Sequence, residues 1–216
     1  MEHKIISRVK GTQDLLDLRL FNYFLKITKE HLENYNFKEI STPIIEHAEL
    51  FLRTLGTETD VVTKQMYMLQ THEAHDSNLS ESEKICLRPE ATASIMRAYL
   101  EAHITQVPWK VFTYGPMFRY ERPQKGRYRQ FHQLSMEIIN APQVSQDAFF
   151  IASLDRLFSQ RLMLDNYALL INFLGCSQDR VKFKFKLAEF IADKVICDTC
   201  NIRKEKNLLR IFDCKK

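Results

Sequence analysis

The chain has 216 residues, of which 45% are hydrophobic and 27% are charged. This is the composition of a globular protein with one sizeable core, or with one domain and the start of another. It contains no apolar run of about 18 residues and no apolar segment near its start that is long enough for a secretory signal. We therefore expect no transmembrane helix and a cytoplasmic location. The net charge of +4 permits a polyanionic partner without requiring one.

The five cysteines, Cys86, Cys176, Cys197, Cys200 and Cys214, are odd in number and irregularly spaced. This pattern is typical of reduced cytosolic thiols. Cys197 and Cys200 form one C-x-x-C pair, which Cys214 could join at a zinc ion. A structural zinc site uses four ligands, usually as two such pairs, and no histidine follows Cys176. The sequence therefore favours an interpretation without a metal site.

The N-terminal part begins with apolar side chains at helical spacing over residues 15–35, which predicts a helix with Asp14 or Asp17 as its N-cap. Asn36 stands where this helix should stop, because asparagine tolerates the left-handed conformation. A short strand is predicted at residues 38–42, just before a proline.

A second helix should end at Gly56, and residues 61–69 have the composition of a strand. The polar segment 71–82 that follows contains His72 and His75. An H-x-x-H pair can bind a metal, but no further ligand cluster accompanies this pair. A solvated hairpin tip is the favoured interpretation.

A further strand is predicted at residues 85–87, and Pro89 is suited to the first turn of the helix that follows. Glu90 then falls in that first turn, where the helix dipole favours a carboxylate. On this interpretation it is a helix-start residue without a further role. The predicted core face of the helix consists of Ile95, Met96, Tyr99 and Leu100.

After a strand at residues 109–114, Ser145 can cap a long helix that reaches Leu164. Residues 167–173 form an apolar run that fits a central strand. The composition changes after Gly175, so we expect a domain boundary there.

The most informative segment runs over residues 114–140 and predicts two strands joined by a loop. The loop contributes four basic side chains, Arg122, Lys125, Arg127 and Arg129. Because side chains alternate along a strand, Arg119 and Glu121 share one face of the first strand, and Gln133 and Glu137 share one face of the second. An arginine, carboxylates and an amide beside positive charge suit a ligand with both phosphate and amine groups. The alternative is a solvated basic turn.

Three segments carry a family resemblance. The sequences F-R-Y-E, R-P-Q-K-G-R-Y-R and Q-F-H-Q-L-S-M-E resemble motif 2 of the histidyl-tRNA synthetases, which are class II aminoacyl-tRNA synthetases. The first helix and strand, continued by I-I-E-H-A-E-L-F-L-R-T-L-G, resemble motif 1, which forms the dimer interface in that family. Packing of this helix on its own domain is the alternative. L-R-P-E-A-T resembles the family's histidine-binding segment, with Ala91 where glycine is usual.

The resemblance implies an α+β fold in which an antiparallel sheet is flanked by helices. Residues 1–175 would form the N-terminal part of the catalytic core, and residues 176–216 the start of a helical insertion domain. The R-G-L-x-Y-Y segment, motif 3 and the anticodon-binding domain are expected to be absent. We therefore expect little or no aminoacylation by this chain alone.

The implied activity is ATP-dependent activation of histidine to histidyl-adenylate, followed by transfer to the 3′ end of tRNA(His). Mg²⁺ would bind through the ATP phosphates. Arg119 is implied as the catalytic residue, which contacts the α-phosphate and the histidine carboxylate. The implied histidine-binding residues are Glu90, Ala91, Thr92, Arg119, Gln133 and Glu137. The implied ATP-binding residues are Arg119, Glu121, Arg127 and Phe131. The implied contacts to the tRNA acceptor stem are Arg122, Gln124 and Lys125.

Two other classes of function stay open. One is a regulatory paralogue, similar to the synthetase-related subunit of ATP phosphoribosyltransferase, and the other is a non-catalytic RNA-binding or dimerisation fragment. A regulatory protein has no need of residues that bind ATP and tRNA, so the intact basic loop argues against the first alternative.

Overall fold

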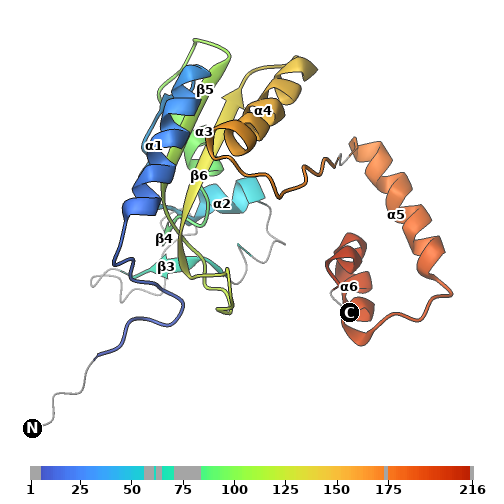
Figure 1. Ribbon diagram of the computed structural model, residues 1–216. Coiled ribbons are helices and arrows are strands. Elements are labelled where there is room, and N and C mark those ends of the chain that lie inside the picture. Colours follow the sequence, from blue (N-terminus) through green and yellow to red (C-terminus); the bar gives the residue numbers. More distant parts are fainter. Residues whose placement is uncertain (1–5, 56–60, 62–64, 71–83, 173–174, 215–216) are drawn as a thin grey trace, which may run out of the picture. The chain divides into compact units, whose positions relative to one another are not determined.

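The computed structural model describes residues 6–55, 61, 65–70, 84–172 and 175–214. The chain divides into two compact units, Met1–Asn166 and Tyr167–Lys216, which are described separately (Figure 1). The change of composition near residue 175 falls inside the second unit. The predicted hairpin tip with His72 and His75 lies outside the described residues.

The main sheet of the first unit has the order β1-β5-β6. Its bounds are β1 Lys38–Glu39, β5 Trp109–Phe118 and β6 Gln130–Ile139. Strands β5 and β6 pair antiparallel from Trp109 opposite Ile139 to Phe118 opposite Gln130, while β1 runs parallel to β5. The strand predicted at 109–114 and the first strand of the predicted hairpin are thus one continuous strand. The strand predicted at 38–42 is shorter than expected.

Helices cover both faces of this sheet, as Figure 1 shows for α1 (Arg19–Asn34), α3 (Thr92–Glu101) and α4 (Val144–Arg156). Leu32 of α1 and Phe112 of β5 form one core with apolar side chains of β6 and α4. Leu134, Met136 and Ile138, which alternate with Gln133 and Glu137 along β6, all pack against that core. On the opposite face, Ile95 of α3 packs with Val111 and Met117.

Helix α1 ends as the sequence predicts. Asn36 adopts a left-handed φ of 62°, and the N–H groups of Asn36 and Phe37 donate to the carbonyls of Glu33 (2.9 Å) and Leu32 (3.0 Å). This pair of bonds is the Schellman motif, which satisfies the last carbonyls of a helix. The helix begins at Arg19 and its N-cap is Leu18, which has no capping side chain, so the prediction of Asp14 or Asp17 as the N-cap is wrong. Asp17 lies one residue before the N-cap, where its Oδ1 accepts from the N–H of Arg19 (3.0 Å).

A second sheet in the same unit has the order β2-β4-β3 and is antiparallel. Its bounds are β2 Ile45–His47, β4 Ile85–Leu87 and β3 Tyr67–Leu69. Helix α2 (Ala48–Leu55) packs Phe51 against Cys86 of the central strand and Ala93. Burial raises the pKa of Cys86 to about 11, so this thiol stays protonated at neutral pH. Strand β2 was not predicted, because three residues are too few for alternation to reveal.

Three other predictions are wrong in detail. Ile95 is fully buried in α3, but Leu100 is 65% exposed. The N-cap of α4 is Gln143 and not Ser145, and the helix continues as a π-helical turn, η3 (Leu157–Arg161), which ends before Leu164.

The strand predicted at 167–173 is wrong over its described part. Residues 167–172 form no strand there, and Leu170 and Ile171 are 83% and 68% exposed. A strand needs a partner strand for its backbone groups, and none of the described strands lies in this unit.

The second unit is helical over the residues that are described. Its elements are α5 (Ser177–Ile191), α6 (Asp198–Lys206) and a 3₁₀-helix, η4 (Leu208–Asp213). At the start of α5, Cys176 Sγ accepts from the N–H of Asp179, whose carboxylate accepts from the N–H of Cys176, which is a capping box. Among the described helices of the whole chain, none has both the length and the apolar character that a bilayer crossing requires.

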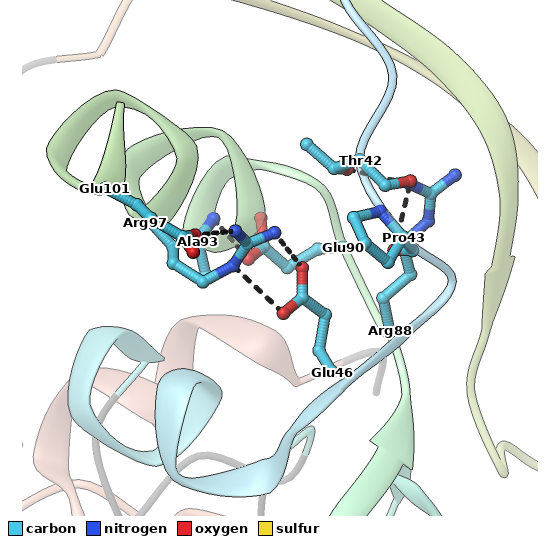
Figure 2. A network of polar contacts seen from close by, with 8 residues as sticks. All are labelled: Thr42, Pro43, Glu46, Arg88, Glu90, Ala93, Arg97 and Glu101. Carbon is cyan, nitrogen blue, oxygen red and sulfur yellow. Dashed lines mark hydrogen bonds and ion pairs between the residues drawn. The ribbon is translucent and has the colours of Figure 1, made fainter. Parts of the chain in front are cut away.

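One buried arginine connects the two sheets of the first unit. Arg88 is 3% exposed, and its Nη1 donates to Thr42 O (2.8 Å) and Thr42 Oγ1 (2.9 Å), as Figure 2 shows. Its Nε donates to Pro116 O (3.2 Å), and the N–H of Phe118 donates to Arg88 O (3.1 Å). The guanidinium fits because position 115 is glycine, where a Cβ would lie 2.6 Å from Arg88 Nη2.

We predict that Arg88→Met destabilises the chain by about 2–4 kcal/mol, because it leaves the carbonyls of buried Thr42 and half-buried Pro116 without this donor. Urea unfolding followed by circular dichroism measures this change. The control, Arg53→Met, removes an exposed ion pair with Glu49 on α2 and should change the free energy of unfolding by no more than about 0.5 kcal/mol. Equal urea midpoints for wild type and Arg88→Met would contradict the structural role of Arg88.

Candidate active site

The start of helix α3 lies directly after Arg88 and carries the first group of predicted site residues. The carboxylate of Glu90 accepts from the N–H groups of Thr92 (2.6 Å) and Ala93 (2.9 Å), so it caps the helix from just outside it. Glu90 is 9% exposed, and Ala91 is fully buried beside Ile95. Ala91 has a φ of −107°, a conformation open to any residue, so alanine fits where the family usually has glycine.

Helix α3 is attached to the second sheet by a nearly buried ion pair. Arg97 donates to both carboxylate oxygens of Glu46, from Nη2 (2.7 Å) and from Nε (3.1 Å), and also pairs with Glu101, as Figure 2 shows. The Glu46 side chain is 5% exposed. Its carboxylate raises the pKa of Arg97, so the guanidinium stays charged. The bidentate pair fixes the direction of α3 and thereby the place of its first turn.

A second carboxylate from β6 meets this first turn. Thr92 Oγ1 donates to Glu137 Oε1 (2.7 Å). Burial and the nearby charge of Glu90 raise the pKa of Glu137, whereas the bond from Thr92 acts in the opposite direction. Two carboxylates with a hydroxyl between them form an acceptor-rich site in which a bound cation would favour the charged form of Glu137.

Arg119 directly follows β5, and its side chain is oriented by the short segment between β4 and α3. Its Nε donates to Pro89 O (2.9 Å), and its guanidinium lies 5.1 Å from the ring centroid of Phe131. The stacked ring and the carbonyl hold the planar group in one direction. Among the described residues, its two terminal nitrogens donate to no protein group. Arg119 therefore contacts the residue that precedes Glu90 in the sequence.

Gln133 lies on the face of β6 that carries Glu137, as the alternation predicts. Its Nε2 donates to Ser135 Oγ (2.8 Å), and Ser135 is buried between the two. Ser135 had no role in the sequence prediction beyond its place on this face, although the spacing of two residues puts it between Gln133 and Glu137.

The loop between the two long strands is itself a narrow hairpin. Gln124 and Arg127 form an isolated bridge around Lys125 and Gly126, and Gly126 takes the positive φ of 77° that this tight turn requires. Arg127 pairs with Glu121 at 3.4 Å, so one loop cation does have an acidic partner. The side chains at the tip, Arg122, Gln124 and Lys125, are exposed.

Arg129 does not extend into solvent with the other basic residues of the loop. Its guanidinium lies 3.9 Å from the ring centroid of Tyr120 and donates to Glu121 O (3.2 Å). Its backbone N–H donates to Gly11 O (2.7 Å). Arg129 therefore lies in the predicted loop between β5 and β6, where it fixes the base of the hairpin against the N-terminal segment.

The structure thus brings Glu90, Thr92 and Glu137 into direct contact beside the loop that orients Arg119. Sequence reasoning gave no role to Arg88, although a basic residue between a buried strand and a proline was a usable signal. The predicted tRNA-contacting residues lie farther along the hairpin, at its tip.

Comparisons with known proteins identify the family of this chain. The family described as tRNA synthetase class II core domain (G, H, P, S and T) matches residues 67–194. Proteins named histidine–tRNA ligase are similar to 97% of this chain, with 44% identity in Thermodesulfovibrio yellowstonii and 42% in Thermosipho africanus. In both cases the match covers 49% of the relative, so the chain spans about half the length of these curated relatives.

Solved structures give the same result. Apo histidyl-tRNA synthetase from S. aureus matches 96% of this chain and 48% of its own chain, with a TM-score of 0.67 and 30% identity. A Bacillus halodurans structure described as an ATP phosphoribosyltransferase regulatory subunit/histidyl-tRNA synthetase matches 88% of this chain with a TM-score of 0.62, but at 19% identity it shows the fold alone. The predicted fold class is confirmed, and the chain belongs to the family of class II tRNA synthetase core domains.

Proposed function

We propose that this chain forms the motif 2 and amino-acid-binding part of a histidine–tRNA ligase, which activates histidine with ATP and transfers it to tRNA(His). The observation that carries the proposal is the contact of Thr92 with Glu137 beside Glu90, next to the oriented guanidinium of Arg119. The identity of 44% to a histidine–tRNA ligase supports the choice of amino acid.

In the activation step, a carboxylate oxygen of histidine attacks the α-phosphorus of ATP, and pyrophosphate leaves. Both reactants are anionic, so a fixed cation must stabilise the charge that develops in the transition state. Arg119 suits this role, because Phe131 and Pro89 O orient it before the substrate binds. A guanidinium also donates bidentate hydrogen bonds and never loses its charge at neutral pH.

The ammonium group of histidine would bind at the carboxylates of Glu90 and Glu137 and the hydroxyl of Thr92. Gln133, on the same face of β6, would bind the imidazole end of the substrate. Ala91 contributes its backbone, because its methyl group is buried. A pocket lined by groups that need partners rejects amino acids without matching groups more strongly than an apolar pocket does.

ATP would lie against the base of the hairpin. Phe131 would stack on the adenine, Glu121 would bind the base, and Arg127 would bind the terminal phosphates. Arg127 and Glu121 would first exchange their mutual ion pair for these contacts, at little cost because the Arg127 side chain is 56% exposed. Mg²⁺ bound between the ATP phosphates would neutralise part of their charge.

The acceptor stem of tRNA(His) would lie along the hairpin tip at Arg122, Gln124 and Lys125. Basic side chains that contact phosphates position an RNA without reading its sequence. These residues sit beyond the amino-acid pocket on the same hairpin, so a stem bound there would direct its 3′ end toward the adenylate. We place this reaction in the cytoplasm.

The homodimer would form through the motif 1 segment. Apolar side chains of the N-terminal segment, α1 and the end of η3 line an open groove, namely Leu15, Leu20, Phe21, Tyr23, Phe24, Phe158, Leu162 and Leu164. Leu20 is 79% exposed and Tyr23 is 55% exposed. An exposed apolar surface of this kind typically marks a protein interface, and a second copy of the same segment is the partner that the family resemblance implies.

We predict that Arg119→Lys lowers histidine-dependent ATP–pyrophosphate exchange about 10²–10³-fold, because an ammonium cannot make the bidentate contact. The assay uses the protein translated from the complete reading frame that contains this chain. Arg53→Lys, on the exposed side of α2, is the control and should keep the wild-type rate. A wild-type protein without histidine-dependent exchange would overturn the ligase proposal in favour of a regulatory paralogue.

The raised pKa of Glu137 predicts a pH dependence of histidine binding. The ammonium group favours ionised Glu137, so affinity should be complete above the raised pKa and should fall as pH drops through it, starting above the ordinary glutamate value of 4.5. The KM for histidine in the exchange assay measures this. Glu137→Gln should bind histidine more weakly and should not show this fall in affinity at low pH. The titration of free histidine affects the measurements on both proteins equally. Parallel profiles would contradict the role of Glu137.

The double variant Arg122→Ala/Lys125→Ala should weaken tRNA binding and reduce the slope of log K against log salt by about one unit for each phosphate that is no longer neutralised. Filter binding at several salt concentrations measures both. Lys26→Ala/Arg53→Ala removes two exposed charges from α1 and α2 and is the matched control. Unchanged pyrophosphate exchange in the hairpin variant would separate RNA positioning from catalysis, and an unchanged salt slope would contradict the RNA contact.

A further inference from the structure

Three cysteines that are distant in sequence converge in the second unit. The Sγ atoms of Cys197, Cys200 and Cys214 all lie within 4.8 Å of one another. Cys200 is 3% exposed, and the other two are half-buried. The fourth cysteine of this unit, Cys176, lies at the start of α5 and is exposed.

The spacing of the sulfur atoms distinguishes a metal site from a disulfide. Cys197 Sγ and Cys214 Sγ are 3.8 Å apart, far beyond the S–S bond length of about 2.05 Å. Thiolates bind Zn²⁺ at about 2.3 Å in a tetrahedron, whose edge is then about 3.8 Å. The observed separation therefore equals the distance that two thiolates on one zinc ion would have.

The backbone presents the three thiols from two helix ends. Cys197 is the N-cap of α6, and its carbonyl accepts from the N–H groups of Cys200 (2.8 Å) and Asn201 (3.0 Å). This tight turn directs both side chains of the C-x-x-C pair to one side. Cys214 follows η4, where its N–H donates to Ile211 O (3.0 Å), and it closes the group from the other side.

Over its described residues, the second unit buries few apolar side chains that could hold these helix ends together. In its described residues the buried apolar side chains are Ile191 and Cys200, whereas Phe183, Phe185 and Phe212 are at least half exposed. A chain segment of about 50 residues rarely supplies enough burial for stability and usually needs a metal or disulfide.

We propose that Cys197, Cys200 and Cys214 bind one Zn²⁺ that fixes α6 to η4. Within the described part of the chain, the group consists of these three thiols, and a fourth ligand would complete the tetrahedron. The site is structural in its effect. The three cysteines belong to the second unit, whereas the residues proposed for catalysis belong to the first. The proposal departs from the sequence interpretation, which favoured no metal.

The first test is the metal content of the complete chain, purified under reducing conditions from zinc-supplemented cells. We expect about one zinc per chain by elemental analysis. Replacement with Co²⁺ should give visible bands of tetrahedral cobalt and near-ultraviolet thiolate charge-transfer bands. Cys200→Ser should lose the bound zinc and these bands, whereas Cys176→Ser should keep both, because serine preserves the helix cap at that position.

A measurement on the wild-type chain does not depend on how well a variant folds. Titration with a mercurial that modifies thiols should release the zinc in step with modification of the protected cysteines, and circular dichroism should show a loss of helix after zinc removal. Absence of stoichiometric zinc and cobalt, or a mass that reveals a Cys197–Cys214 disulfide in the reduced preparation, would overturn the proposal. So would equal zinc loss in Cys176→Ser and Cys200→Ser.

Discussion

The buried guanidinium of Arg88 is the constraint on which the rest of the first unit depends. A charged group that is 3% exposed is stable only when its donors are satisfied, and here carbonyls from two separate parts of the fold satisfy them. Desolvation lowers the pKa of Arg88, although it stays protonated because its ordinary value is so high. The glycine at position 115 follows from this, because any side chain there would occupy the space of the guanidinium.

The position of the proposed amino-acid site follows from the same constraint. Once Arg88 is fixed, Pro89 and Glu90 are fixed by their adjacency, and Pro89 O is presented to Arg119. Glu90 then caps α3, so one carboxylate of the proposed site also has a structural role. The two interpretations of Glu90, as a helix-start residue and as an acceptor for an ammonium, are therefore compatible, because a carboxylate has more acceptor sites than its two backbone bonds use.

Local physical rules predicted part of this arrangement. Alternation along β6 placed Gln133 and Glu137 on one face, and the conformational tolerance of asparagine located the end of α1 at Asn36. Predictions failed where the outcome depends on distant partners. In the sequence, Arg129 cannot be distinguished from the other basic residues of the loop. Its position in the structure is fixed by contacts with Gly11 and Tyr120. The apolar run at 167–172 has strand composition, but a strand forms only beside another strand.

The three cysteines of the second unit are another case in which contacts between distant residues cannot be predicted from the sequence. Counting ligands along the sequence argued against a metal, because one C-x-x-C pair and a single later cysteine do not make the usual four-ligand pattern. The 3₁₀-helix η4 changes that argument by bringing Cys214 to within 3.8 Å of Cys197. Sequence spacing shows that the two thiols of a C-x-x-C pair can meet, because they lie within one helical turn. Whether Cys214, on a separate element, joins them is decided only when the chain is folded. A unit with few buried apolar side chains has the most to gain from such a ligand set, since metal binding then contributes free energy directly to folding.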